Sequence, residues 1–110
     1  MMLLQIYFEV PEANHKAFEQ LYTENYVPAL QIQEGYLRSN LLRVFPPNIA
    51  QEIDAAPTPF NYQMELIFDT EANRRRWVAS EEHQQVWPMA AALAISVAHC
   101  GYNLISLDRG

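Results

Sequence analysis

The chain has a single cysteine, Cys100, among its 110 residues, so it can form no internal disulfide bond. A zinc site built on cysteine pairs is excluded for the same reason. The sequence has only three glycines, and it contains no phosphate-binding loop, dinucleotide fingerprint or G-x-S-x-G motif. No second ligand lies at metal-binding spacing from any of the three histidines. We therefore expect no metal site.

Basic residues are also scarce, because 7 lysines and arginines face 13 acidic residues and the net charge is −6. An acidic chain repels phosphate backbones, so we expect no nucleic-acid partner. The longest nearly apolar stretch, residues 87–98, is too short to span a bilayer. The first ten residues lack the basic region of a signal peptide. The sequence thus predicts a soluble, cytoplasmic protein that does not enter a membrane.

Four segments have the pattern of β-strands. Residues 2–10 and 60–69 alternate regularly, with apolar side chains on one face and mixed side chains on the other. Residues 36–45 alternate poorly, which indicates that both of their faces are partly covered. Residues 97–107 are expected to form the last strand.

Helical spacing of apolar residues occupies the segments between these strands. Pro11 suits the first turn of a helix, and Pro28 should kink or end that helix because it removes a backbone hydrogen bond. Gly35 is a good stop signal. Thr70 can cap a second helix, and Ser80 can cap a third helical piece that is broken or bent at Pro88.

The connection between the second and third strands, residues 46–59, contains four prolines. Asn48, followed by Gln51, can cap a short helical turn within it. A connection of this length is often a lid or an interface arm, and equally often plain filler. The sequence leaves these alternatives open.

The element order β-α-β, loop, β-α-β predicts a single ferredoxin-like α+β domain over residues 1–110. Its helices would cover one face of a four-stranded antiparallel sheet. The first and third strands would be central neighbours, and their second faces would carry Gln5, Tyr7 and Glu9 beside Asn61, Gln63 and Glu65. No element of the chain is left to cover that second face. We therefore expect a homodimer through the sheet face.

Two segments carry a resemblance to a known family: "VPALQIQEGYLRSNLLRV" (27–44) and "ELIFDTEANRRRWVASEEHQQVW" (65–87). The chain resembles the dimeric α+β barrel superfamily, and within it the antibiotic biosynthesis monooxygenase-like domains. The resemblance implies a ligand site between sheet and helices that takes a small apolar or aromatic molecule. If the chain is an enzyme, it implies a cofactor-independent monooxygenase acting on an aromatic or polyketide-like substrate.

Two alternatives stand beside this interpretation. The chain could be a non-catalytic binding or stress-response module, whose predicted pocket is filled core. It could also be a small-molecule isomerase, which would need a convergent acid and base in the same cavity. A cavity of several hundred cubic ångströms beside Trp77 would favour a ligand, whereas a packed interior would favour a structural role.

The stretch "RRRWVASEEHQQVW" (74–87) holds the most suggestive residues of the chain. Its three arginines point about 100° apart on a helix, so they form a solvated face paired with Glu71 rather than one anion site. Trp77 matches a family position that faces the pocket. His83 and Trp87 share one helical face, where His83 can move a proton or serve as a structural histidine.

Glu65 is the most suggestive carboxylate because it lies mid-strand on the face that dimerisation would cover. Burial there would raise its pKa and let it act as a base; the alternative is a hydrogen-bonded or salt-bridged interface residue, with Arg38 as partner. The candidate catalytic residues are His83, Glu65 and Asn61, and the candidate ligand-binding residues are Tyr7, Tyr26, Trp77 and Trp87.

We expect no cofactor, haem included. Haem-degrading relatives place an iron-ligating histidine ten residues after the family tryptophan, and an asparagine on the first strand. In this sequence the tenth residue after Trp77 is Trp87, and the first strand has no asparagine. An indole N–H can only donate a hydrogen bond and cannot ligate iron.

Overall fold

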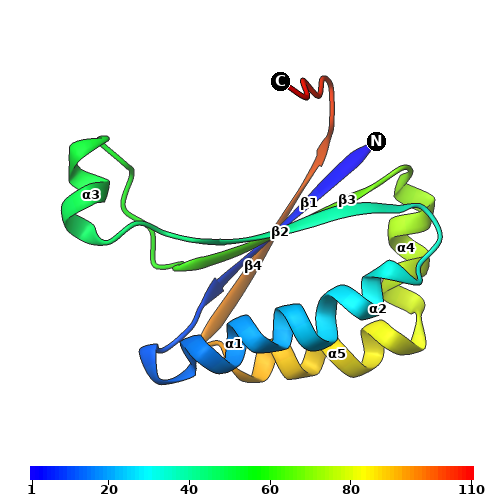
Figure 1. Cartoon of the computed structure of the whole chain (residues 1–110), viewed down its shortest axis with the longest axis horizontal. Coiled ribbons are helices and arrows are strands. Elements are labelled where there is room, and N and C mark those ends of the chain that lie inside the picture. The colour runs from blue at the N-terminus through cyan, green and yellow to red at the C-terminus, as the bar shows by residue number, and fades with distance from the viewer.

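Four strands form one antiparallel sheet in the order β2-β3-β1-β4 (Figure 1). The structure is a computed structural model that describes all 110 residues. The strands are β1 (Met2–Glu9), β2 (Tyr36–Arg43), β3 (Tyr62–Phe68) and β4 (Ser96–Asn103). The predicted ferredoxin-like α+β fold is confirmed, with β1 and β3 as the central pair.

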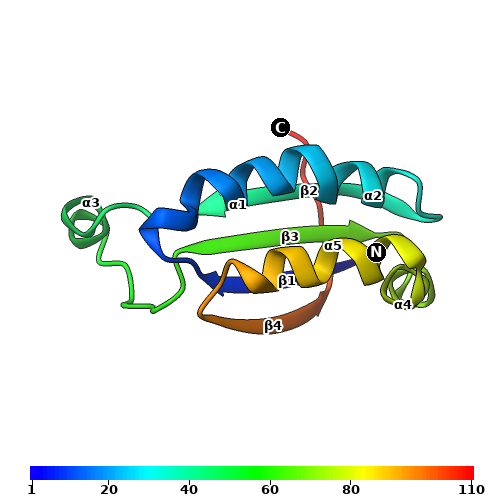
Figure 2. The ribbon, with the colours of Figure 1, turned by 90° about the horizontal axis from the view of Figure 1, so that it is seen from below.

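All the long helical segments lie on one face of the sheet (Figure 2). The first runs without a break through a 3₁₀ turn η1 (Glu12–Asn14), α1 (His15–Leu21), a π-helical turn η2 (Tyr22–Tyr26) and α2 (Val27–Gln31). The second comprises α4 (Glu71–Ala79) and α5 (Glu81–Ala92). The short helix α3 (Pro47–Glu52) lies apart from both (Figure 1). No helix is both long and apolar enough to cross a membrane.

The core lies between the sheet and the helices. Alternate residues of β1 and β3 point into it, as the period of two requires, and aromatic rings join the two layers. The ring centroids of Phe8 and Phe18 are 4.9 Å apart, and those of Phe18 and Tyr62 are 5.0 Å apart. Only 17 of the 110 residues are buried, and all of them are hydrophobic. The core is thus small, and the opposite face of the sheet, called the open face below, carries no helix.

Neither helical proline breaks its helix, so the breaks expected at Pro28 and Pro88 are corrected, while the expected bends stay predictions. A π-helical turn precedes Pro28 and restarts the hydrogen-bond pattern, which leaves Pro28 in the first turn of α2, where its missing N–H is not needed. Pro88 lies inside α5, which is continuous from Glu81 to Ala92. Pro88 and Gln84 are both exposed, so water can satisfy the carbonyl group that the proline leaves unpaired.

Two predicted helix caps are confirmed and one is wrong. The N–H of Asn73 donates to Thr70 Oγ1 at 3.1 Å, and the N–H of His83 donates to Ser80 Oγ at 3.1 Å. Asn48 does not cap α3. Pro47 begins that helix one residue earlier, because its fixed φ suits the first helical position.

Three strands are shorter than expected. β2 ends at Arg43, β3 begins at Tyr62, and β4 ends at Asn103. The flanking prolines of residues 46–59 cannot donate to a strand ladder. β4 stops because its last partner is Met2, at the start of β1. Residues 44–59 and 104–110 therefore leave the sheet, and they are called the arm and the tail below.

Candidate functional site

A cavity of about 380 Å³ lies between the sheet and the helices α4 and α5. We call it the interlayer cavity. Its lining includes residues from η2, α4, α5 and the helix-facing side of β1 and β4: Ile6, Tyr26, Trp77, His83, Trp87 and His99. The predicted ligand-binding residues Tyr26, Trp77 and Trp87 and the predicted catalytic His83 therefore lie together.

Aromatic rings surround His83 in the wall of this cavity. Its imidazole is stacked on Trp87, with ring centroids 6.1 Å apart and ring planes 8° apart. The same imidazole meets Trp77 edge-on, at 5.0 Å and 90°. Trp87 also approaches His99, at 5.4 Å. Flat π-surfaces of this kind favour a planar aromatic ligand, because aromatic rings pair in offset-stacked and edge-to-face arrangements.

Two buried side-chain polar atoms have no hydrogen-bond partner: the hydroxyl oxygen of Tyr26 and Nδ1 of His83. Both belong to side chains that line the interlayer cavity. An unpaired buried polar group costs about 1–3 kcal/mol, so nearly all such groups in folded proteins are paired. Two side chains thus have unmet hydrogen-bonding groups, and both belong to residues that line the same cavity.

The local structure fixes these side chains before any ligand binds. Tyr26 is fully buried in the π-helical turn, and Trp77 is 1% exposed. Their rings meet edge-on, with centroids 5.7 Å apart. His83 is held by its backbone, since its N–H is bonded to Ser80 at the start of α5. Rigid placement of the polar groups lowers the entropy cost of binding.

The two histidines and the tyrosine of the site are uncharged near pH 7, and the one lining charge is that of Arg74, which pairs with Glu71. Burial lowers the pKa of His83, and the nearby His99 lowers it further. Burial also lowers the pKa of His99 and raises the pKa of Tyr26. Both imidazoles are therefore unprotonated and the phenol keeps its proton. A neutral imidazole can accept a proton from a bound molecule, and the phenol can donate a hydrogen bond.

His99 also lines the cavity, although the sequence pattern did not indicate it as a site residue. Its register partner is Ile6, which faces the helices. His99 therefore shares that inward face, although it remains exposed at the edge strand β4. The signal was its alternation with Val97 along the last strand, but the pairing of β4 with β1 was needed to bring it beside Trp87.

Glu65 and Tyr7 lie on the open face, away from the interlayer cavity. The side-chain amides of Gln5 and Gln63 each donate to Glu65 Oε2 at 3.1 Å, and the Tyr7 hydroxyl donates to Gln5 Oε1. Arg38 makes no ion pair with Glu65, because the register places Asn40 opposite Glu65. Glu65 is thus hydrogen-bonded by amides and not by Arg38, and its role as a base stays a prediction.

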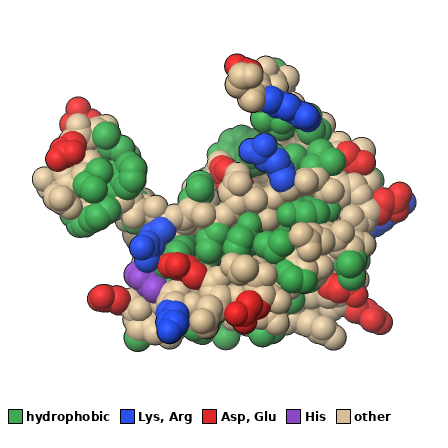
Figure 3. Space-filling view, viewed as in Figure 1, with side chains coloured by type: hydrophobic (Ala, Val, Ile, Leu, Met, Phe, Trp, Pro, Cys, Tyr) green, Lys and Arg blue, Asp and Glu red, His purple; other side chains and the backbone are tan.

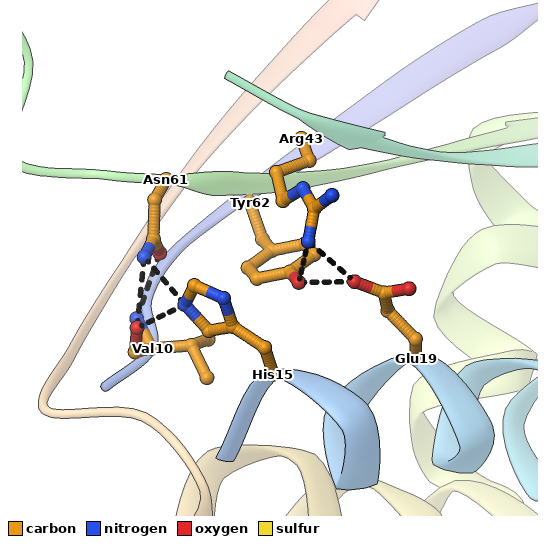
Figure 4. Close-up of polar contacts among 6 residues, drawn as sticks. All are labelled: Val10, His15, Glu19, Arg43, Asn61 and Tyr62. Carbon is orange, nitrogen blue, oxygen red and sulfur yellow. Dashed lines mark hydrogen bonds and ion pairs between the residues drawn. The ribbon is translucent and has the colours of Figure 1, made fainter. Parts of the chain in front are cut away.

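Asn61 lies at the far end of the sheet and is engaged by the backbone (Figure 4). The Val10 N–H donates to Asn61 Oδ1, and Asn61 Nδ2 donates to the Val10 carbonyl oxygen, both at 2.8 Å. His15 Nε2 lies 3.2 Å from Asn61 Nδ2. The amide of Asn61 thus continues the strand ladder beyond the end of β3, and the structure does not bring it together with His83.

Beside Asn61, a second polar group fixes α1 to the end of the sheet (Figure 4). Arg43 Nη1 lies 3.1 Å from Glu19 Oε2, and the Tyr62 hydroxyl donates to the same carboxylate. Burial and this hydrogen bond raise the pKa of Tyr62. Both polar groups stand at the base of the arm, and they tie it to the helix layer.

Arg75 and Arg76 lie on the solvated face that the sequence predicts, whereas Arg74 is half-buried and lines the interlayer cavity, which corrects the prediction for that residue. Arg74 and Arg75 both pair with Glu71, the second at 3.3 Å. Arg76 instead pairs with Glu34, at 2.9 Å. No group of three or more histidine, cysteine or carboxylate side chains is placed to hold a metal ion.

A larger hollow, of about 730 Å³, lies on the open face at the base of the arm. Its lining includes Tyr7, Leu42, Phe45 and Phe60. None of the atoms left without a hydrogen-bond partner belongs to its lining. We therefore assign the candidate ligand site to the interlayer cavity, where the unmet polar groups are.

Comparison with known proteins supports the fold. No protein-family profile and no curated protein matches the chain. Solved structures do match: a variant of SnoaB, a cofactor-independent oxygenase from Streptomyces nogalater, has a TM-score of 0.75 at 17% identity, over 99% of this chain and 97% of its own. HapK from Hahella chejuensis has a TM-score of 0.76 at 12% identity, over 100% and 98%. An antibiotic biosynthesis monooxygenase has a TM-score of 0.70 at 12% identity, over 96% and 100%.

These matches define the class of structure. The chain has the ferredoxin-like α+β fold found in antibiotic biosynthesis monooxygenase-like structures, as the resemblance of its sequence implies. At identities of 12–17% the likeness concerns the fold, since one fold carries many functions. The function must be argued from the interlayer cavity.

Proposed function

We propose that the interlayer cavity binds a small, flat, largely apolar aromatic molecule that carries at least two polar oxygen atoms. The observation that carries this proposal is the pair of unpaired buried groups, the Tyr26 hydroxyl and His83 Nδ1, at one cavity. A ligand oxygen at each group would remove the cost of leaving it unpaired. Trp77 and Trp87 supply the aromatic walls.

The reaction proposed for this site is cofactor-independent monooxygenation of an electron-rich aromatic substrate. SnoaB, which shares the fold, is a cofactor-independent oxygenase. His83 Nδ1 would take a proton from an activated methylene group, while the Tyr26 hydroxyl would stabilise the negative charge on the adjacent oxygen. The resulting carbanion reduces dioxygen and forms a hydroperoxide. Loss of water, with the proton returned by His83, leaves a ketone, so one oxygen atom enters the product and the other enters water.

We also propose that the chain works as a homodimer through the open face. Exposed apolar side chains lie there, among them Leu42 at 44% and Tyr102 at 47%. The hydrogen-bonded group around Glu65 occupies the middle of the face and satisfies its own polar atoms. A second copy could cover this face while the carboxylate oxygens of Glu65 keep their hydrogen-bond donors.

Tryptophan fluorescence tests the ligand site, because both tryptophans of the chain line the cavity. Dithranol, a flat three-ring anthrone with two phenol groups, serves as the probe under anaerobic conditions. We expect saturable quenching of the wild type. Tyr26→Phe should bind about fivefold more weakly, since one hydrogen bond contributes about 1 kcal/mol. Tyr36→Phe is the matched control, because that hydroxyl donates to Ser39 outside the cavity.

The outcomes separate the candidate functions. Quenching that is equal in wild type and in both tyrosine variants would contradict the assignment of the ligand to the interlayer cavity. If dithranol binds specifically but no oxygen is consumed when air is admitted, the protein is a binding module and not a monooxygenase. Stoichiometric oxygen uptake with formation of the corresponding quinone would support the monooxygenase.

A further inference from the structure

The arm is a projecting lobe at one end of the sheet, on the side of the open face (Figures 1 and 3). All of its side chains are exposed except Ile49 and Ala50, which are half-buried. The radius of gyration is 14.6 Å, whereas a compact domain of this length should have about 13 Å. The chain is thus more extended than its own core requires.

The base of the arm is fixed. Val44 N–H donates to the Asn61 carbonyl oxygen at 2.9 Å, and this pair closes the loop. Arg43 on one side is tied to Glu19, and Asn61 on the other side is tied to Val10 (Figure 4). The two chain segments that enter and leave the arm are therefore held in place at the end of the sheet.

The composition of the arm is apolar and acidic. Phe45 and Ile53 are 55% and 61% exposed, and the carboxylates Glu52 and Asp54 lie at the end of α3. The arm has no lysine or arginine. Figure 3 shows its hydrophobic side chains on the side that faces the space above the sheet. A monomer would leave this surface in water, where exposed apolar groups are unfavourable.

A complementary groove lies at the opposite end of the sheet. Its volume is about 550 Å³, and its lining comprises the apolar residues Met1, Leu37, Ile67 and Leu107 together with the charged residues Arg38, Asp108 and Arg109. Neither arginine forms an ion pair within the chain. The Asp108 carboxylate accepts a hydrogen bond from the N–H of Gly110. The groove thus offers an apolar floor, two arginines that form no ion pair, and one carboxylate.

Strand direction relates the arm to the groove. β2 runs from Tyr36 to Arg43, so the groove stands at its beginning and the arm at its end. A two-fold axis that lies above the open face, parallel to the sheet and perpendicular to the strands, turns one open face onto the other and reverses the strands. Such an axis brings the arm of each copy to the groove of the other, twice, as the symmetry of an isologous dimer requires.

We infer that the arm of one copy binds the groove of a second copy, with Phe45 and Ile53 on its apolar floor and Glu52 and Asp54 beside Arg38 and Arg109. This inference rests on the proposed dimer through the open face, and it adds the element that sets the orientation of the two copies. The arm is then an interface element, which is one of the roles that the sequence left open. Complementary charges fix register and suppress wrong pairings.

A charge-swap experiment tests the arm. The arm variant is Glu52→Arg, and the groove variant combines Arg38→Glu with Arg109→Glu. Each variant alone places like charges together, so we expect its dimer Kd to rise at least tenfold. In a mixture, both contacts of the heterodimer are complementary. Native mass spectrometry should therefore show the heterodimer well above the statistical half of all dimers.

The control is Glu12→Arg, an exposed residue of the helix layer, which should leave the Kd unchanged. If the arm variant and the groove variant each dimerise with the wild-type Kd, and their mixture forms heterodimers only at the statistical fraction, the arm does not contact the groove. The dimer through the sheet face would remain. A wild-type chain that is monomeric at micromolar concentration would overturn the dimer itself. Preferential heterodimers also show that both variants are folded, because an unfolded chain could not restore the contact.

Discussion

Replacing His83 with glutamine is expected to lower kcat for aerobic oxidation of dithranol by roughly 100-fold or more, the range of a lost general base. Glutamine keeps a polar side chain beside Trp77 and Trp87 but cannot accept the proton. Initial rates of oxygen consumption, measured with the enzyme saturated, isolate the effect on kcat from the effect on binding. Tyr26 remains, so the variant should still bind the probe.

The pH profile of the wild type supplies an independent readout. Burial and His99 lower the pKa of His83, so the free base persists below the ordinary histidine value of about 6.5. We expect kcat to be constant near pH 7 and to fall only on the acid side of that value, where His83 becomes protonated. The acid limb should disappear in His83→Gln.

His15→Gln is the matched control, because His15 is bonded to Val10 at the other end of the fold. Its kcat should stay within about twofold of wild type. A His83→Gln variant that is fully active, or one with an unchanged acid limb, would remove His83 from the reaction. A variant that neither binds nor turns over dithranol would assign His83 to binding alone.

Replacing Leu42 with glutamate is expected to raise the dimer Kd at least 100-fold. Leu42 lies on the open face, opposite Gln63 on the neighbouring strand, and is 44% exposed. The change leaves the isolated chain intact, because a charge at an exposed position stays in water. In the dimer the same carboxylate would be buried without a partner, which costs several kcal/mol. Sedimentation equilibrium over a range of concentrations measures this Kd.

Met89→Glu is the control on the opposite layer, where Met89 is 45% exposed on α5. It should dimerise like wild type. Equal affinities for Leu42→Glu and Met89→Glu would place the interface elsewhere. Ile67 shares the alternation of Glu65, so the sequence predicts it to be an equivalent test position, but only 4% of its surface is exposed and it lines the groove beside the tail. A charge there would disturb the monomer as well as the interface.

The fold is readable in the sequence because burial imposes strong periodicities. β1 and β3 alternate with a period of two, so the residues that face the helices and those that face away can be told apart along both strands. Thr70 and Ser80 mark their helix starts by a local bond to the backbone. The continuity of the helices at Pro28 and Pro88 was not predictable from local rules. It depends on a π-helical turn before Pro28 and on an exposed carbonyl group near Pro88.

The candidate site is readable only in part. The spacing of His83 and Trp87 along one helix is local information, and the structure brings them together with Trp77 and Tyr26. His99 depends on the pairing of β4 with β1, which lies far away in sequence. Asn61 shares its alternation with Glu65, yet it lies beyond the end of β3, where the backbone of Val10 engages it. Alternation gives the face of a residue but not its hydrogen-bond partner.

The most direct test of the interlayer cavity as a ligand site is a nuclear magnetic resonance titration with dithranol, followed through the two indole N–H signals. We predict that the Trp77 and Trp87 signals shift saturably at one dithranol per chain, while the backbone amides of Phe45 and Phe60, at the open-face hollow, stay unchanged. Shifts confined to Phe45 and Phe60, with both indole signals unmoved, would contradict the account.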